Sequence, residues 1–280
     1  MPMTVAARPW AAGVRGGSPA VLLVAWLCGG LLLAFILLPL IQLFAVQTGG
    51  SMLQVARQAD VRDALALSVG ASLLTAFVAG LFGVPLAYLL ARVNFRGRTA
   101  VAAAIDLPLT VPHTVAGIAL LMVFGRHGVL GEPLETLFGL RFWGTLAGIV
   151  VAMLFVSVPY TVNAARIAFE AVDPRLEMVA RTLGMGPLQA LWRVTLPLAW
   201  RGIATGLTLT FARSISEFGA VVILVYYPMT APVQIYEMFL NYGLESASAA
   251  AALLLLVSLV LFIAFRHFAY GRRLIAGSGR

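Results

Sequence analysis

The sequence contains no lysine, a single cysteine and only three histidines, and each shortage excludes a class of chemistry. Without lysine the chain cannot carry the phosphate-binding loop G-x-x-x-x-G-K-[ST], so any ATPase that works with it must be another subunit. Cys28 lies alone within an apolar run, and the histidines at positions 113, 127 and 267 are far apart along the chain. Neither a disulfide framework nor a metal-ligand cluster is therefore indicated.

Charge is also scarce, because only 11% of the residues are charged, whereas a soluble domain usually carries about 25%. Hydrophobic residues make up 61% of the chain, and the mean hydropathy is +0.97. Most of the chain must therefore face lipid. Six stretches are apolar over the roughly 20 residues that a spanning helix needs, and they lie at 19–46, 63–91, 99–124, 144–168, 200–225 and 246–268. The first is longer than the apolar core of a signal peptide, about 7–15 residues, and reads as a retained helix. We predict an all-α membrane protein with six transmembrane helices in a single domain, 1–280.

The net charge of +8 is explained by where the arginines lie. Placing the amino terminus in the cytoplasm puts most of them on one side, either in loops or at helix ends. Only Arg57, Arg62, Arg126 and Arg141 then fall outside. Cytoplasmic loops of membrane proteins carry such an excess of basic residues, so both termini are expected in the cytoplasm. The partner implied by the charge is the membrane itself, and nothing calls for nucleic acid.

The predicted cytoplasmic loop, 169–199, contains signals for two short helices. Asp173 followed by Pro174 is typical of a helix start, and Gly184 suits the position just after a helix end, so residues 174–183 should form one helix. Gly186 and Pro187 begin a second. Apolar residues repeat at helical spacing in both, which gives each an apolar face outside the bilayer: Leu176, Val179, Ala180 and Leu183 in the first, and Leu188, Leu191, Trp192 and Thr195 in the second.

This loop resembles the cytoplasmic EAA loop of bacterial ABC importer permeases, in which E-A-A-x-x-x-G is followed nine residues later by I-x-L-P. Ala180, Gly184 and the segment 194–197 match the pattern, whereas Met178 stands at the family's glutamate position and Glu177 comes one residue early. The resemblance implies a type I ABC importer permease whose loop is a coupling helix seated on an ATPase. The implied contact residues are Glu177, Arg181, Thr182, Leu183, Gly184, Met185, Gly186 and Leu188. The alternative is an amphipathic linker that lies on the lipid headgroups.

The fifth span contains two ionisable residues, Arg213 and Glu217, about one helical turn apart. Charges inside a membrane usually face a bundle interior or an aqueous path. One reading is an intrahelical ion pair that only neutralises both charges. The other is that Arg213 and Glu217, with the hydroxyls of Ser214 and Ser216, line or gate the path of an anion.

The third span carries two prolines, Pro108 and Pro112, which should kink it and free backbone groups for polar partners. A broken helix beside Thr110, His113 and Thr114 is a plausible pore element. A histidine in such a place is more often simply hydrogen-bonded within the bundle, so both roles stay open.

Two further segments refine the resemblance. Ala212-Arg213-x-x-x-Glu217-Phe218-Gly219-Ala220 is similar to the fifth span of permeases for molybdate, tungstate and sulfate, and the segments 105–117 and 228–232 look most like the tungstate and molybdate branch. The resemblance implies import of a tetrahedral oxyanion through a homodimer in the bacterial cytoplasmic (inner) membrane. It also implies two copies of an ATPase that binds ATP and Mg²⁺, and a periplasmic or extracytoplasmic binding protein that delivers the anion.

Three function classes compete. The first is this permease subunit, which is not itself an enzyme and binds no cofactor, with a sulfate or thiosulfate permease of the same class as a close variant. The second is a secondary transporter in which Asp106, His113 and Glu217 relay protons. The third is an intramembrane enzyme, which lacks support because no catalytic pairing of histidine with serine or a second metal ligand is evident.

Overall fold

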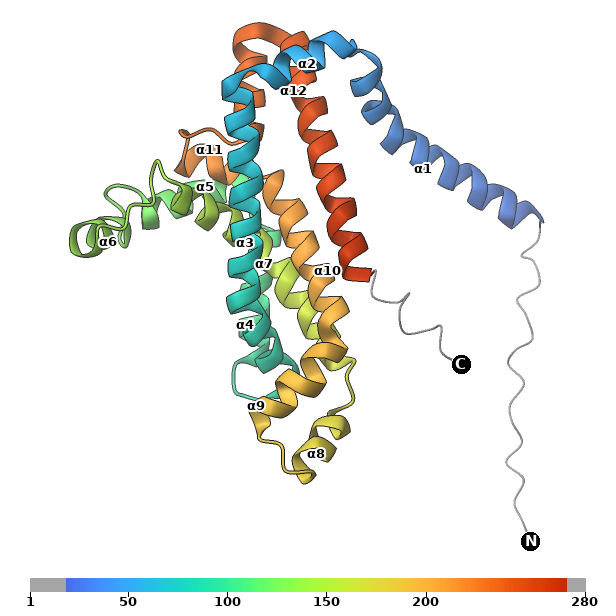
Figure 1. Cartoon of the computed structure of the whole chain (residues 1–280), viewed down its shortest axis with the longest axis vertical. Helices are drawn as coiled ribbons and strands as arrows, with labels where there is room; N and C mark the ends of the chain where they lie inside the picture. The colour runs from blue at the N-terminus through green and yellow to red at the C-terminus, as the bar shows by residue number, and fades with distance from the viewer. Residues whose placement is uncertain (1–18, 271–280) are drawn as a thin grey trace. The chain divides into compact units, whose positions relative to one another are not determined.

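The computed structural model describes residues 19–270, which fold into helices and connecting turns without any strand (Figure 1). This confirms the all-α prediction. The contact pattern separates residues up to Thr48 from residues Gly49 onward, so the two units are described in turn. The helices are α1 (Pro19–Ala45), α2 (Gly49–Arg57), α3 (Ala59–Arg92), α4 (Arg98–Asp106), a 3-10 turn η1 (Leu107–Leu109), α5 (His113–Phe124), α6 (Gly131–Phe138), α7 (Leu146–Glu170), α8 (Pro174–Thr182), α9 (Pro187–Ala190), a π-helical turn η2 (Leu191–Thr195), α10 (Leu196–Ile215), α11 (Gly219–Leu224) and α12 (Ala231–Tyr270).

The first unit contains the single long helix α1. Its 27 residues carry no acidic side chain in the first turn and no basic side chain in the last, and they cover almost the whole stretch predicted as the first span. Apolar side chains such as Trp26 and Phe35 are exposed around the helix. A helix that is apolar on every side is typical of a segment surrounded by lipid.

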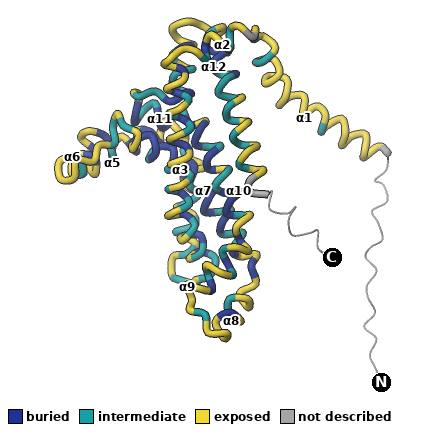
Figure 2. Tube along the Cα trace, viewed as in Figure 1, coloured by how far each residue is buried: buried dark blue, intermediate teal, exposed yellow. Residues whose placement is uncertain are grey.

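The second unit is built on α3, α7 and α10, which lie side by side (Figure 1). Small residues let α7 and α10 approach closely: a Cβ atom added at Gly202 would lie 2.4 Å from the Cβ of Ala168, and one at Gly206 would lie 2.9 Å from the Cβ of Ala164. Such small-residue contacts are the usual way in which helices associate in a membrane. Buried positions accordingly gather along these helices (Figure 2).

Hydroxyl groups join the same two helices. Thr161 and Thr210 share a hydrogen bond of 2.7 Å, and Ser214 donates to the Ser157 hydroxyl over 3.0 Å. All four side chains are fully buried. Because each polar group has a partner, the ladder adds interhelical bonds without leaving an unsatisfied group in the bundle.

The third predicted span is bent far more sharply than a kink. It consists of α4 and η1 on one side of the break and α5 on the other, and the two halves meet at 112°. Pro108 and Pro112 cannot donate backbone hydrogen bonds, which explains the interruption. As a result α5 leaves the bundle sideways and continues into α6, a short helix not predicted from the sequence (Figure 1).

The fifth predicted span, 200–225, is also interrupted, because α10 ends at Ile215 and α11 begins at Gly219. Two side chains replace the missing helical hydrogen bonds. The Ser216 hydroxyl donates to the carbonyl of Arg213 over 3.0 Å, and a Glu217 carboxylate oxygen accepts from the Ala220 amide over 2.9 Å. Glu217, one residue before the N-cap Phe218, therefore satisfies an amide in the first turn of α11 in addition to any role of its charge.

The last helix is longer than the predicted span 246–268, since α12 runs from Ala231 to Tyr270 with a break at Gly243, where φ is +80°. A further unforeseen outer helix, α2, precedes α3. Among residues 19–270, four helices are long and apolar enough to cross a membrane, or up to five if the bent pair counts as one span. The count of six spans, and their union in one domain, stay predictions.

Candidate functional site

The breaks in the third and fifth spans bring their half-helices into backbone contact. A Cβ atom added at Gly219 would lie 2.8 Å from the Cβ of His113, and one at Gly117 would lie 3.0 Å from the Cα of Ala220. Only glycine fits at such approaches. The start of α5 is thereby held against the start of α11, next to the last turn of α10.

Three predicted site residues meet at this junction: His113, Arg213 and Glu217. One guanidinium nitrogen of Arg213, Nη2, lies 2.7 Å from Oε2 of Glu217 and 2.7 Å from Nε2 of His113. The guanidinium group only donates hydrogen bonds, so the ring nitrogen that it bonds accepts; Nε2 is the nearer of the two, and the other, Nδ1, lies 3.3 Å from Nη2. His113 Nδ1 lies 3.7 Å from Glu217 Oε2. The three groups form one polar cluster, which we call the Arg213 cluster.

The Arg213 cluster presents its cationic side outward. The Glu217 side chain is 1% exposed, whereas those of Arg213 and His113 are 21% and 46% exposed. Ser216 is exposed beside the cluster, and Thr110 and Thr114 are exposed around the break in the third span. Ser214, predicted for the same group, is instead buried against Ser157 of α7.

The depth of the cluster makes this exposure informative. Arg213 lies 17 residues after the start of α10, or roughly 25 Å along a helix axis. Contact between a guanidinium group and hydrocarbon is unfavourable, by about 2.5–3.5 kcal/mol at the centre of a spanning helix. The exposed face of the Arg213 cluster must therefore meet water or another protein surface.

The predicted coupling loop has the local structure that its sequence indicates. The Asp173 side chain accepts from the backbone amide of Arg175 over 2.9 Å and caps α8. Gly184 follows the helix with φ of +91°. The amide of Met185 bonds the carbonyl of Ala180 over 3.1 Å, and that of Gly184 bonds the carbonyl of Arg181 over 3.0 Å, which is a Schellman ending.

The tip of this loop is open. Arg181, Thr182, Leu183, Gly184, Gly186 and Leu188 are exposed, and Met185 is partly exposed. The apolar faces predicted for the two loop helices are largely exposed to solvent. The exposed fractions of Val179, Leu183, Leu188 and Trp192 are 56%, 77%, 67% and 63%. An apolar patch of this kind outside the bundle is typical of a contact surface.

Glu177 differs from the other predicted coupling residues, because its carboxylate is held within the chain. It pairs with Arg92 of α3 at 3.1 Å and accepts hydrogen bonds from Thr195 and Tyr88. These partners lie 85, 18 and 89 residues away in the chain, so the local sequence does not reveal them. Its direct contact with an ATPase stays a prediction.

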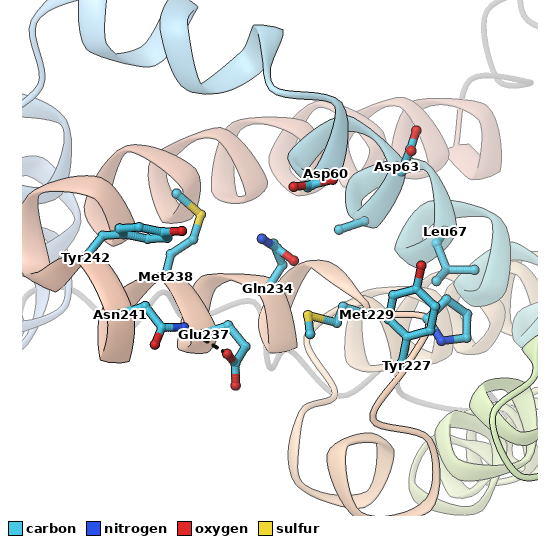
Figure 3. Close-up of a pocket in the computed structure, with 12 residues that line it drawn as sticks. Asp60, Asp63, Leu67, Tyr227, Met229, Gln234, Glu237, Met238, Asn241 and Tyr242 are labelled. Atoms are coloured by element: carbon cyan, nitrogen blue, oxygen red, sulfur yellow. Dashed lines mark hydrogen bonds between the residues drawn. The ribbon is translucent and has the colours of Figure 1, made fainter.

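A pocket of about 360 Å³ at the other end of the second unit was not predicted from the sequence. Figure 3 shows the carboxylates of Asp60, Asp63 and Glu237 around it. Glu237 accepts hydrogen bonds from Asn241 and from Tyr226, and the bond to this carboxylate raises the pKa of the Tyr226 hydroxyl. The acidic lining of this pocket does not suit an anion. Within residues 19–270, no group of three or more His, Cys, Asp or Glu side chains is placed to hold a metal ion.

Residues 83–274 match one protein family, which is described as "Binding-protein-dependent transport system inner membrane component". The chain belongs to this family. It is 42% identical over 240 residues to the molybdate/tungstate transport system permease protein WtpB of Thermococcus kodakarensis, covering 85% of this chain and 92% of that protein. It is 34% identical to a probable sulfate transport system permease protein of Helicosporidium sp., over 83% and 89% of the two chains.

The fold is similar to that of solved importers. A bacterial ABC transporter involved in the import of alginate contains a chain that matches with a TM-score of 0.71 at 19% identity, over 91% of this chain and 96% of that one. The protein is thus an ABC importer permease, a transport component of the membrane. The proton-relay alternative finds no support in the geometry, because Asp106 hydrogen-bonds Asn163 of α7 at 2.6 Å instead of joining His113 and Glu217.

Proposed function

We propose that this permease imports a tetrahedral oxyanion, molybdate or tungstate, at the expense of ATP hydrolysed by a partner subunit. The observation that carries the proposal is the 42% identity to a molybdate/tungstate permease over 85% of the chain. The lower identity of 34% to a sulfate permease makes sulfate or thiosulfate the second candidate within the same class.

The Arg213 cluster is the proposed point of contact with the anion. Arg213 presents nitrogen donors on the exposed side, with its guanidinium group held in place by the bond to His113, and Ser216, Thr110 and Thr114 add hydroxyl donors nearby. Oxyanions are bound by such charge-assisted and neutral hydrogen bonds. Glu217 lies behind Arg213 and keeps the site neutral when no anion is present. Ser214 contributes indirectly, by fixing α10 against α7.

The same exposed charges support a homodimer. A second copy of the permease that faces the Arg213 cluster would remove it from lipid and enclose an aqueous path between the two copies. Two ATPase subunits, which bind ATP and Mg²⁺, would contact the exposed loop tips at Arg181, Thr182, Leu183, Gly184, Met185, Gly186 and Leu188. A binding protein would deliver the anion to the opposite side of the bacterial cytoplasmic membrane, with both chain termini in the cytoplasm.

Uptake in vesicles tests the substrate. The permease, its ATPase and its binding protein are reconstituted, and ATP-dependent accumulation of molybdate, tungstate and sulfate is measured. We expect saturable uptake of molybdate or tungstate that is lost without ATP. Uptake of sulfate with neither of the other two anions would refute the substrate assignment.

The double variant Arg213→Met with Glu217→Leu tests the path. It removes both charges together, so the protein should still fold while uptake falls, because no guanidinium group remains to offset the loss of water around the anion. Retention of wild-type uptake by the double variant would show that the ion pair is only structural.

A further inference from the structure

The end of α3 is tied to the coupling loop by a compact set of polar contacts. Arg92, the last residue of α3, places Nε 3.1 Å from Oε1 of Glu177 and donates from Nη2 to the carbonyl of Val172 over 2.8 Å. The same carboxylate accepts from the Thr195 hydroxyl over 2.7 Å and from the Tyr88 hydroxyl over 3.2 Å. We call these five residues the Arg92 clamp.

The Arg92 clamp is shielded from solvent, unlike the pairs that Glu170 forms with Arg98 and Arg166 at this end of the bundle. The side chains of Arg92 and Glu177 are 12% and 18% exposed. By contrast, Arg98 and Glu170 are 36% and 43% exposed, and their charged atoms are 3.3 Å apart. Hydrogen bonds between charged groups are strongest where water is excluded, and exposed pairs contribute little. The Arg92 clamp is thus a firm connection, and the Arg98 pair provides a natural control.

The Arg92 clamp connects the coupling loop to the ends of three long helices, α3, α7 and α10. Arg92 and Tyr88 belong to α3, and Val172 lies in the turn after α7. Glu177 lies in α8, and Thr195 is the last residue before α10. The loop tip on the far side of α8 and α9 is exposed. A displacement of the tip reaches α10 along the chain itself, through η2, whereas the clamp contacts tie α8 to α3 and to the end of η2.

We propose that the Arg92 clamp holds the coupling loop rigidly to α3 and α10, so that a displacement of the loop by the ATPase moves the membrane helices. Glu177 is then a positioning residue that acts through Arg92 and Thr195, and its carboxylate is not a ligand of the ATPase. This proposal rests on the proposed ATP-driven import.

Spin labels test the rigidity without any ATPase or substrate. Cys28, which is exposed, is first replaced by serine. Labels are then attached to cysteines introduced at Leu89 on α3 and Thr182 at the loop tip of the full-length permease in lipid nanodiscs. The distance distribution should be narrow in this Cys28→Ser background and broaden with Glu177→Gln or Arg92→Gln. It should stay narrow with the matched control Glu170→Gln. Equal widths in all three variants would overturn the proposal.

Transport coupling tests the consequence in the assembled transporter. Glu177→Gln and Arg92→Gln should each lower anion uptake per ATP hydrolysed by roughly tenfold, within the range typical of coupling between two sites. The two changes together should cost no more than either alone, because both remove the same contact. Glu170→Gln should retain wild-type coupling.

The outcomes separate the alternatives. If Glu177 is a direct ligand of the ATPase, Glu177→Gln will weaken binding of that subunit while Arg92→Gln leaves coupling unchanged, and the proposal fails. If the wild-type complex imports neither molybdate nor tungstate, the substrate assignment fails, and the spin-label distances still decide whether the clamp exists.

Discussion

Replacing Arg213 by methionine gives the sharpest test of the polar cluster, because it leaves a buried charge behind. Glu217 is 1% exposed and loses its closest cationic partner, at 2.7 Å. Removing one member of a buried ion pair typically costs about 3–5 kcal/mol. The Ala220 amide and the His113 ring remain within 2.9 Å and 3.7 Å of the carboxylate. We therefore expect a loss at the lower end, about 3 kcal/mol.

The free energy of unfolding is measured by SDS titration of the purified permease in mixed micelles. Arg98→Met serves as the control, because it breaks an exposed pair and should cost less than about 1 kcal/mol. The double variant Arg213→Met with Glu217→Leu should recover only part of the loss, because leucine removes the unpaired charge but leaves the buried Ala220 amide without its acceptor. If Arg213→Met costs no more than Arg98→Met, Glu217 does not depend on Arg213, and the electrostatic account of the cluster is refuted.

Three further outcomes are expected. In a cysteine-free background, a membrane-impermeant thiol reagent added outside should label cysteine at His127 but not at Gly186; the reverse pattern would invert the topology. Gly184→Val should lower the free energy of unfolding by roughly 1–2 kcal/mol, because Val is strained at φ of +91°. The same change should lower anion uptake and stimulated ATP hydrolysis together, and normal uptake would show that this turn is not needed for coupling. Gly202→Ala should cost about 1–3 kcal/mol in the SDS assay, because its methyl group would lie 2.4 Å from a neighbouring Cβ. Gly70→Ala, which meets nothing within 4 Å, should be tolerated, and equal losses would contradict the packing of α7 on α10.

The coupling loop was predictable because its signals are local. Asp173 caps the helix that starts one residue later, and Gly184 ends it within the same short segment. Long apolar runs likewise place α3 and α7 close to the predicted stretches, since hydrophobicity alone determines which segments enter lipid.

The breaks and the polar networks depend on contacts that a sequence does not display. His113 and Arg213 are 100 residues apart, and Arg92 and Glu177 are 85 residues apart. The interruption after Ile215 arises where Glu217 accepts from an amide in the first turn of the next helix, inside a run that hydropathy reads as continuous. The first part of α12 escaped detection because polar residues, including Gln234, Glu237 and Asn241, lower its hydropathy.

The hydrogen bond from the Ala220 amide to Glu217 restricts what can replace this glutamate. Glutamine would preserve the length and could still accept from the Ala220 amide, but it would give Arg213 no negative charge. Aspartate would keep the charge, yet its side chain is one methylene shorter than the one that now reaches both Arg213 and the start of α11. Each substitution satisfies one requirement at the expense of the other. Among relatives that share this junction, position 217 should therefore vary less than a residue with only one of these two tasks.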